Sequence, residues 1–552
     1  MIVKDFTRNP YGLPHAELRP GQADTIDWLM QFAGNAAVVN APTGSGKTSF
    51  AAAMASRART VALVKTKNLQ KENYGGSYEF DVLFGRGNYD CVHPEASSYA
   101  TASECMYTGA MYECEYADQC PYLLAKGDAS SSMRASLNYS YWLAAGWPAE
   151  KLWKSHGYLF CDEAHQLSDV VLDHTSITVT MAERLDWDLP AFPVVRGRAT
   201  DAEVEACAGW LGNAAQVLRA AARAMAPQGA AGDEDAWDSE DEPAEKLSEP
   251  VMRRLRKCRS LLAKVTAVGE ALETNADDWY IRCGPNARNT VAGREPAFIA
   301  RPLTARYHFP RYFLSDEWKT VMMSATIGDP ATFAAELGLV DYEYRDIPNS
   351  WPAASRPVLA LDAPPMGYAT RDDEKVLGKQ AQVIAAAIKE VPDNWSGFVH
   401  VTRKTEAAAL AGRLARYGLG HRVWTPSPTD GTEKAMAEWK QVKRRQPGAL
   451  AVAWAWWEGV DGREEKISIV AKTPFPSLGD DYERERMNYS GAMFLQRTAW
   501  QMEQGLGRSR RGNAGDYDTT GQRNGLVAIA DGNWRRVQKY FSQSLRDALV
   551  LS

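Results

Sequence analysis

The sequence predicts an α/β protein with two doubly wound domains, each a parallel sheet with helices on both faces. Three observations predict this fold class. A short apolar segment at 36–40 precedes a glycine-rich loop and a helix-forming segment at 48–55, as in a strand-loop-helix unit. Buried-strand patterns return at 397–401 and 450–454, and the first of them precedes a helical pattern at 404–414. The chain has 552 residues, too many for one core, so several compact domains are expected.

The glycine-rich loop reads APTGSGKT over residues 41–48 and predicts a site for ATP and Mg²⁺. Its glycines let backbone N–H groups approach phosphate oxygens, and the loop runs into the N-terminus of a helix. Lys47 can reach the β and γ phosphates, and the Thr48 hydroxyl can hold Mg²⁺. The first position is alanine, where the usual motif has glycine. The expected nucleotide contacts are Thr43, Gly44, Ser45, Gly46, Lys47 and Thr48.

A second apolar strand, at 158–161, ends in the tetrad DEAH and brings two carboxylates to the edge of the sheet. Asp162 is suited to hold Mg²⁺ through water, and Glu163 to accept a proton from the attacking water. A third strand at 320–323 leads into the small hydroxyl residues of Ser-Ala-Thr at 324–326. Together with the phosphate loop, these residues predict hydrolysis of ATP.

The second half carries the sequence QGLGRSRR, in which Gln504, Arg508 and Arg511 are spaced by four and three residues. On a helix this spacing places all three side chains on one face. We expect Arg508 and Arg511 to neutralise charge that develops on the γ-phosphoryl group, and Gln504 to orient the water.

Four cysteines lie between the phosphate loop and the DEAH tetrad, with thirteen, eight and five intervening residues. They form no C-x₂-C pair, which is the spacing that zinc ribbons favour, so the spacing makes zinc the weaker interpretation. By their chemistry, four thiolates suit either a tetrahedral zinc or a [4Fe-4S] cluster. The spacing alone does not separate the two. The candidate ligands are Cys91, Cys105, Cys114 and Cys120, whereas we expect Cys161, Cys207, Cys258 and Cys283 to be packing residues.

In order and number, these motifs resemble those of the XPD/DinG family of iron-sulfur superfamily 2 DNA helicases. The matching segments also include RPGQ at 19–22, TKNLQ at 66–70, GRGNYDC at 85–91, EGVD at 458–461 and TPFP at 473–476. The resemblance implies two RecA-like motor domains, with a small iron-sulfur insertion and a helical arch-like insertion in the first. The implied boundaries are 1–85, 126–175 and 305–352 for the first motor domain, 86–125 for the cluster, 176–304 for the arch and 353–552 for the second motor domain.

The resemblance also implies roles for residues outside the phosphate site. Gln22 would read adenine, and Asp461 in EGVD would couple the bound strand to ATP. Trp454, Trp456 and Trp457 precede EGVD, and core packing is the better interpretation of this group. An aromatic face can also stack on a base for about 1–3 kcal/mol, and Trp457 is the strongest candidate for such a contact. The expected DNA contacts are Thr66, Gln70, Arg86, Tyr139, Thr402, Arg403 and Trp457.

Two near-heptad patterns, at 204–225 and 251–272, predict a pair of long helices at the place of the arch. The acidic segment between them, 232–245, predicts a disordered connector. The second helix carries five basic residues within 253–259, which would line a DNA passage or form a solvated face.

The resulting hypothesis is an ATP-dependent DNA helicase that moves along single-stranded DNA, 5′ to 3′ by resemblance, as a monomer that binds duplex junctions. Alternatives are a translocase or remodeller of RNA-DNA hybrids without processive unwinding, a packaging or restriction ATPase, and an inert nucleic-acid-binding scaffold. Composition allows all of these, since 24% of residues are charged and the net charge is −6. We expect a cytoplasmic protein without a membrane partner, because the N-terminus lacks a signal-peptide pattern and no apolar stretch approaches about 20 residues.

Overall fold

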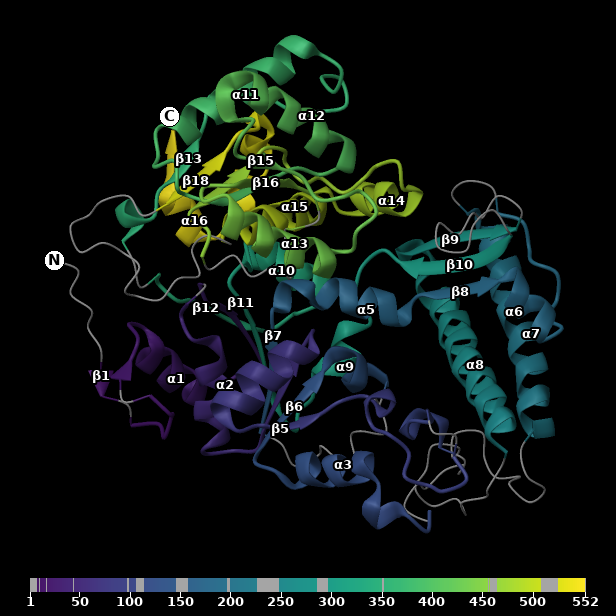
Figure 1. Cartoon of the computed structure of the whole chain (residues 1–552). Coiled ribbons are helices and arrows are strands. Elements are labelled where there is room, and N and C mark those ends of the chain that lie inside the picture. The colour runs from purple at the N-terminus through teal and green to yellow at the C-terminus, as the bar shows by residue number, and fades with distance from the viewer. Residues whose placement is uncertain are drawn as a thin grey trace.

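The computed structural model describes residues 7–551 except 9, 16, 43, 97–98, 106–113, 145–156, 196–198, 226–247, 285–295, 350–351, 455, 457–463 and 508–524. Figure 1 shows two α/β domains, the first in purple and blue below the second in green and yellow. A helical arm projects from their side. A small two-stranded sheet, β1 (Thr7–Arg8) with β2 (Glu17–Leu18), precedes the first domain.

The first domain is a seven-stranded parallel sheet in the order β12-β3-β11-β7-β4-β6-β5. Its central strands are apolar on both faces, as expected for a sheet that helices cover on both sides. The strands are β3 (Ala36–Asn40), β4 (Thr60–Val64), β5 (Asp81–Leu83), β6 (Arg134–Asn138), β7 (Tyr158–Asp162), β11 (Lys319–Ser324) and β12 (Glu343–Asp346). The helices are α1 (Gln22–Gln31), α2 (Lys47–Ala55), α3 (Pro121–Ser131), α5 (Leu167–Thr175), α9 (Phe309–Phe313) and α10 (Pro330–Leu337).

The second domain repeats this plan with a parallel sheet in the order β15-β16-β14-β17-β18-β13-β19. The strands are β13 (Val358–Ala360), β14 (Gly397–His400), β15 (Val423–Trp424), β16 (Leu450–Ala453), β17 (Ile467–Val470), β18 (Leu526–Ile529) and β19 (Leu549–Leu551). The helices are α11 (Glu374–Lys389), α12 (Lys404–Leu414), α13 (Thr432–Arg445), α14 (Asp481–Tyr489), α15 (Gly491–Leu506) and α16 (Gln543–Ala548). The two predicted doubly wound domains are therefore confirmed.

The arm extends from the first domain and spans 177–302. Its base is the antiparallel sheet β8-β10-β9, and its shaft is a pair of long helices with one shared core. Cys207 and Leu211 from one helix pack with Leu255 and Cys258 from the other, as the heptad pattern predicts. The predicted acidic connector lies outside the described residues. The elements are β8 (Ile177–Thr180), α6 (Met181–Asp186), α7 (Asp201–Met225), α8 (Glu249–Asn275), β9 (Trp279–Gly284) and β10 (Ala297–Pro302).

None of the helices in the described ranges combines the length and the apolar character that a membrane span requires.

Candidate nucleotide and nucleic-acid site

The predicted phosphate, metal and hydroxyl motifs meet at one edge of the first sheet. In the parallel register Ser324 lies beside Asn40, and Met323 lies beside Asp162. The carboxyl ends of β3, β7 and β11 are thus neighbours, and the loops that leave them share one crevice. The sheet order, not the sequence order, brings these motifs together.

The phosphate loop has the backbone conformation that its glycines predict. Gly44 and Gly46 adopt φ values of 89° and 80°, in the left-handed region that other residues rarely enter. A Cβ atom at Gly46 would meet the Gln22 amide nitrogen at 2.3 Å, so this glycine is also required by close packing. The loop runs directly into α2, whose first N–H groups are free to bind an anion. Thr43 lies outside the described residues.

Gln22 supports the phosphate loop from α1. Its amide donates to the Ser45 carbonyl at 2.8 Å and to the Ser49 hydroxyl at 3.0 Å, and its carbonyl oxygen accepts from the Arg19 N–H at 2.7 Å. The side chain is only 5% exposed. The structure therefore gives Gln22 a direct contact with the loop, whereas its contact with adenine stays a prediction.

Lys47 and Glu163 face each other across the crevice. The Lys47 ammonium nitrogen lies 3.8 Å from a Glu163 carboxylate oxygen. Glu163 has a φ of 52°, a conformation that is uncommon for a residue other than glycine and that typically marks a functional constraint. Its unusual backbone turns the side chain out of the strand direction of β7, toward the phosphate loop.

Asp162 is buried at the end of β7, with both carboxylate oxygens held by hydrogen bonds. One oxygen accepts from the Glu163 N–H at 2.9 Å, and the other accepts from the Tyr74 hydroxyl at 3.1 Å. Burial raises the pKa of Asp162, and the nearby Lys47 ammonium opposes that rise. A buried carboxylate that is oriented by hydrogen bonds is a ligand that fits Mg²⁺.

A chain of polar contacts crosses from this crevice to the second domain. The His165 ring bonds the Ser324 hydroxyl at 2.9 Å and lies 3.5 Å from Glu163. Ser324 contacts Thr326 at 3.3 Å, and the Gln504 amide from α15 reaches Thr326 at 3.5 Å. The helix α15 is described to Leu506, so the helix predicted through Arg511 stays a prediction. Arg508 and Arg511 lie outside the described residues.

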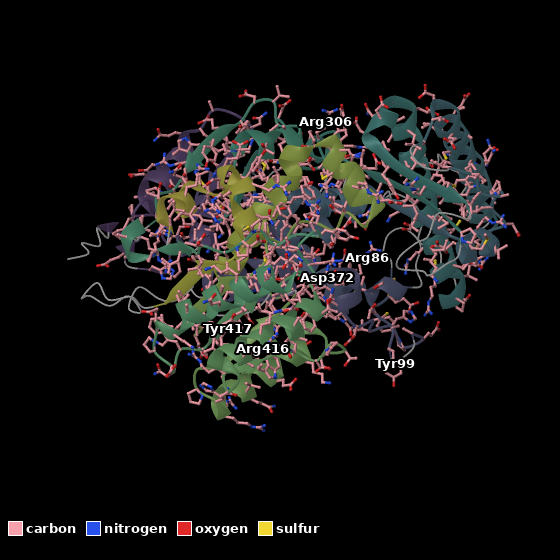
Figure 2. The ribbon with its side chains drawn as sticks, turned by 90° about the horizontal axis from the view of Figure 1, so that it is seen from above. Arg86, Tyr99, Arg306, Asp372, Arg416 and Tyr417 are labelled. Carbon is pink, nitrogen blue, oxygen red and sulfur yellow. The ribbon has the colours of Figure 1, made fainter. Side chains whose placement is uncertain are left out.

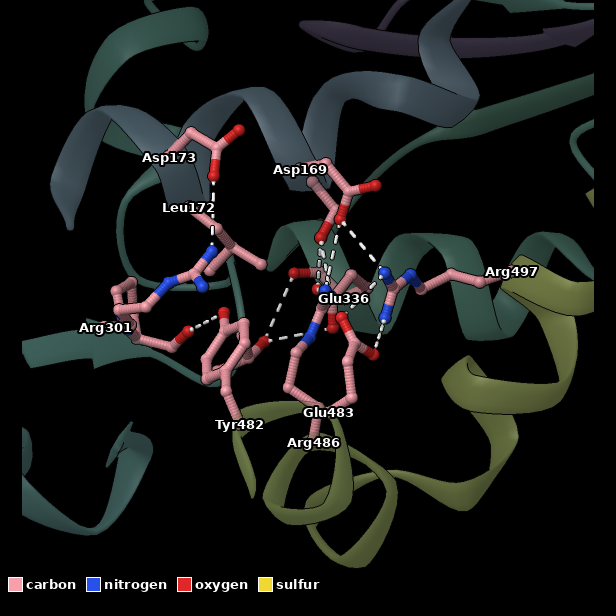
Figure 3. Close-up of polar contacts among 12 residues, drawn as sticks. Asp169, Leu172, Asp173, Arg301, Glu336, Tyr482, Glu483, Arg486 and Arg497 are labelled. Atoms are coloured by element: carbon pink, nitrogen blue, oxygen red, sulfur yellow. Dashed lines mark hydrogen bonds and ion pairs between the residues drawn. The ribbon is translucent and has the colours of Figure 1, made fainter. Parts of the chain in front are cut away.

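A network of charges joins α14 and α15 to the first domain, on α5 and α10 (Figure 3). Arg486 donates to Asp169 at 3.1 Å and to Glu336 at 3.4 Å, and Arg497 donates to Glu483 at 2.8 Å. The side chains of Arg486 and Glu336 are each only 5% exposed. Burial raises the pKa of Glu336, and Arg486 opposes that rise. No sequence pattern predicts this network, because its members lie far apart along the chain.

The base of the arm contacts α14 as well. Tyr482 donates to the Pro302 carbonyl at 2.7 Å, and Arg301 lies 4.0 Å above the centroid of the same ring. Arg282 pairs with Asp481 at 3.3 Å. The helix α14 is thus held by the arm and by the first domain at once.

Two of the predicted nucleic-acid contacts are interior residues. Gln70 is fully buried, and its amide donates to the carbonyls of Leu83 and Ser136 at 2.8 and 2.6 Å. Tyr139 is 2% exposed, and its hydroxyl donates to the Asp162 carbonyl at 2.7 Å. Both side chains serve the fold of the first domain in this structure.

The other predicted contacts lie at the surface or outside the described part of the chain. Thr66 is exposed just after β4, and Arg403 is exposed at the start of α12, next to the half-buried Thr402. Arg86 is exposed above the Tyr122 ring, at 5.5 Å from its centroid (Figure 2). Trp456 is a core residue at 2% exposed. Trp457 and Asp461 lie outside the described residues.

The four candidate cysteine ligands gather in one small subdomain beside α3. Burial raises the pKa of the Cys91 thiol, and the nearby thiols of Cys105, Cys120 and Cys114 add to the rise. Arg256 of α8 donates to the carbonyl of Cys105 at 2.6 Å and ties this subdomain to the arm. Among the residues that the structure describes, no group of three or more His, Cys, Asp or Glu side chains is arranged to hold a metal ion.

Two of the basic side chains predicted along α8 contact other parts of the protein. Arg254 pairs with Asp186 at 3.0 Å and lies 4.3 Å above the Trp187 ring. Arg256 contacts the cysteine subdomain, as described above. These contacts favour structural roles for Arg254 and Arg256.

Comparison with solved structures identifies the architecture. A structure titled XPD_Helicase matches with a TM-score of 0.53 and 12% identity, over 96% of this chain and 98% of that chain. The chain shares the fold of an XPD helicase. A second structure, titled XPD_APO, has a TM-score of 0.49 and 13% identity over 96% and 99% of the two chains. Dbp5 from S. cerevisiae bound to RNA and ADP BeF3 has a TM-score of 0.39 and 11% identity over 97% and 90%.

No protein-family model matches the sequence. No curated protein matches it either. The XPD match confirms the predicted pair of RecA-like domains, and any activity has to be argued from the site.

Proposed function

We propose that this protein is an ATP-dependent DNA helicase that couples hydrolysis to movement along single-stranded DNA. The observation that carries the proposal is the crevice at the edge of the first sheet. There Lys47 faces Glu163 at 3.8 Å, and Asp162 lies between a backbone amide and a phenol. This set supplies a phosphate ligand, a base and a metal-binding carboxylate within one site.

Each group has a distinct task in hydrolysis. The glycine-rich loop and the N-terminus of α2 bind the phosphate oxygens, and Lys47 neutralises charge on the β and γ phosphates. Glu163 accepts the proton of the attacking water. Asp162 and Thr48 would hold Mg²⁺, which supplies electrostatic stabilisation of the phosphates when bound. Gln504 reaches this site from the second domain through Thr326, so closure of the domains completes it.

The exposed residues at the carboxyl ends of the strands favour a nucleic-acid strand across both domains. Thr66 follows β4 in the first domain, and Arg403 follows β14 in the second. Ligands of open α/β sheets bind at this edge. Arg86, which is exposed as well, lies in the segment that leads to the cysteine subdomain.

The cysteine subdomain fits an iron-sulfur cluster by its donor chemistry. Four thiolates are the ligand set of a [4Fe-4S] group. Cys91, Cys105, Cys114 and Cys120 would hold the group, which would stabilise the local fold that Arg256 links to the arm.

The decisive experiment compares ATP hydrolysis with and without single-stranded DNA, followed by strand separation on duplexes with 5′ or 3′ tails of DNA or RNA. We expect DNA to stimulate hydrolysis, and 5′-tailed DNA duplexes to be separated. Lys47→Ala is the matched negative control. Equal turnover with and without DNA refutes the proposal. Hydrolysis with strand movement but no duplex separation would instead identify a translocase.

A further inference from the structure

A buried tyrosine, Tyr74, holds the carboxylate that would bind Mg²⁺. Its hydroxyl donates to Asp162 at 3.1 Å. The side chain is 0% exposed, and its ring packs edge-on against Phe80 at 5.2 Å between centroids. The phenol is therefore fixed by packing as well as by this hydrogen bond, so it can fix the rotamer of Asp162.

Tyr74 belongs to an unusual helix. The residues Leu69–Gly76 form a π-helix, named η1, which is a rare conformation that often occurs at functional sites. This helix follows β4 and begins three residues after the exposed Thr66, where the strand of nucleic acid is proposed to bind. Gln70 in the same helix is bonded to the carbonyls of Leu83 and Ser136. The π-helix is thus a rigid connection from the sheet edge to the metal-binding carboxylate.

The close packing of η1 strengthens this connection. A Cβ atom at Gly75 would meet the Val82 side chain at 2.9 Å, which is too close for an ordinary contact. The helix therefore packs closely against β5 at Gly75. Thr66 is joined to η1, because its carbonyl accepts a hydrogen bond from the Gln70 N–H at 3.1 Å.

The chain offers a matched comparison in Tyr139. It is also buried, at 2% exposed, and its hydroxyl also bonds Asp162, at 2.7 Å. That bond goes to the backbone carbonyl and not to the carboxylate. Replacing either phenol by phenylalanine removes one buried hydrogen bond to the same residue, but only one of the two replacements releases the carboxylate.

We propose that Tyr74 is a positioning residue that orients Asp162 toward Mg²⁺ and links the geometry of this carboxylate to nucleic-acid contact at the start of η1. The inference rests on the proposed function and names the residue that couples the nucleotide site to the nucleic acid. By thermodynamic reciprocity, a strand that stabilises η1 in the productive position strengthens binding of Mg²⁺ with nucleotide, and Mg²⁺ with nucleotide strengthens strand binding.

The test measures the affinity for a fluorescent, non-hydrolysable ATP analogue in EDTA and in saturating Mg²⁺, with and without oligo(dT). The ratio of the two affinities reports the Mg²⁺ contribution without any catalytic turnover. We expect Tyr74→Phe to reduce this ratio about tenfold, which is the scale of one hydrogen bond to a charged group. Oligo(dT) should increase the ratio in the wild type and not in Tyr74→Phe.

Tyr139→Phe is the control and should keep the Mg²⁺ ratio of the wild type, although both variants should show a similar loss of thermal stability. Gly75→Ala, which retains the phenol but forces η1 away from Val82, should reduce the ratio as Tyr74→Phe does. It provides a second measurement if Tyr74→Phe fails to fold. A wild-type ratio in Tyr74→Phe overturns the proposal, and so does an equal reduction in Tyr139→Phe.

Failure of this inference is distinguishable from failure of the proposed function. The proposed function is tested by DNA-stimulated hydrolysis in the wild type. The positioning role is tested by the difference between two phenylalanine variants in their Mg²⁺ ratio, which is measured on the nucleotide alone. A protein that hydrolyses ATP with DNA and shows no such difference keeps its function and loses this role for Tyr74.

Discussion

Glu163 has a strained backbone and an acidic side chain that faces Lys47, and we propose that it is the base for the attacking water. Glu163→Gln keeps the size of the side chain and removes its basicity. We expect nucleotide binding to persist and hydrolysis to fall about 10²- to 10⁴-fold. Lys47→Ala should weaken nucleotide binding itself. Steady-state hydrolysis and fluorescent nucleotide titration separate the two effects, and wild-type turnover in Glu163→Gln would remove that residue from the mechanism.

Glu503, the residue before Gln504, makes the stability of the protein depend on pH. Its carboxylate accepts bonds from the N–H and the hydroxyl of Ser542 at 2.6 and 2.7 Å. Burial raises the pKa of Glu503 from 4.5 to about 7, and the bonds from Ser542 oppose that rise. The folded state therefore binds this proton more tightly than the unfolded state, so the free energy of unfolding falls as pH rises through this interval.

Glu503→Gln removes the ionisable group. The variant should therefore avoid up to about 3 kcal/mol of the decrease in the free energy of unfolding that the wild type shows as pH rises. Denaturant titrations of both proteins at about pH 5 and about pH 8 provide the measurement, since these values lie on either side of most of the transition. The variant should lose less stability than the wild type between the two. An identical loss in both proteins would show that Glu503 is not the group responsible.

At the residue scale, local spacing predicted the parts of the site that are local in sequence. Gly44, Gly46 and Lys47 occupy a loop whose conformation follows from its own residues. Tyr74 could not be predicted, because its partner Asp162 is 88 residues away and the π-helix has no simple periodicity. The family resemblance places Gln70 at the nucleic acid, whereas in the structure its buried amide bonds two backbone carbonyls inside the fold.

Among the elements, α14 is the clearest case of stability that depends on one buried charge. Arg486 is 5% exposed on its side chain and pairs with Glu336, which is equally buried. Removal of one partner leaves the other as an uncompensated buried charge. Arg486→Ala should therefore lower the free energy of unfolding by about 3 kcal/mol. Thermal and denaturant unfolding of the purified protein measure this loss.

Arg484 on the same helix is the matched control. Its side chain is 47% exposed and pairs with Asp481, three residues away. Arg484→Ala should change the stability by less than about 0.5 kcal/mol. If both replacements cost the same, the buried network of Figure 3 is not what holds α14 against the first domain.

Element boundaries followed the sequence where propensity and packing agree. The predicted strand at 36–40 is β3, and the predicted helix at 404–414 is α12. The helix predicted through Arg511 stays a prediction beyond Leu506, where the described part of α15 ends.

For the whole molecule, the order of motifs along the chain was enough to predict two RecA-like domains, because each phosphate or acid motif follows a strand of its own. The contacts between the domains were not predictable, because they join segments as distant as Asp169 and Arg486. The arm was predicted as a helical pair from its heptad pattern, and its three-stranded base was not. Short strands without alternating polarity give little signal.

Loss of a cysteine ligand should affect more of the molecule than the cysteine subdomain itself. Arg256 from the arm bonds the carbonyl of Cys105, so the arm and the candidate cluster support each other. Cys105→Ser replaces a thiolate by a poor iron ligand, and the subdomain should loosen. The two sheets have separate cores, so DNA-stimulated hydrolysis should survive in part while duplex separation is lost.

The measurement pairs an iron assay and a visible absorbance spectrum on anaerobically purified protein with hydrolysis and strand-separation assays. Cys258→Ser is the control, because this cysteine is buried in the arm and bonds the Leu218 carbonyl at 3.2 Å, away from the candidate ligands. It should retain the colour and the iron. An iron-free, colourless Cys105→Ser protein that still separates duplexes would show that the cluster does not couple hydrolysis to unwinding. A stoichiometric zinc content in the fresh wild-type protein would replace the cluster by a structural zinc, since four thiolates bind either metal.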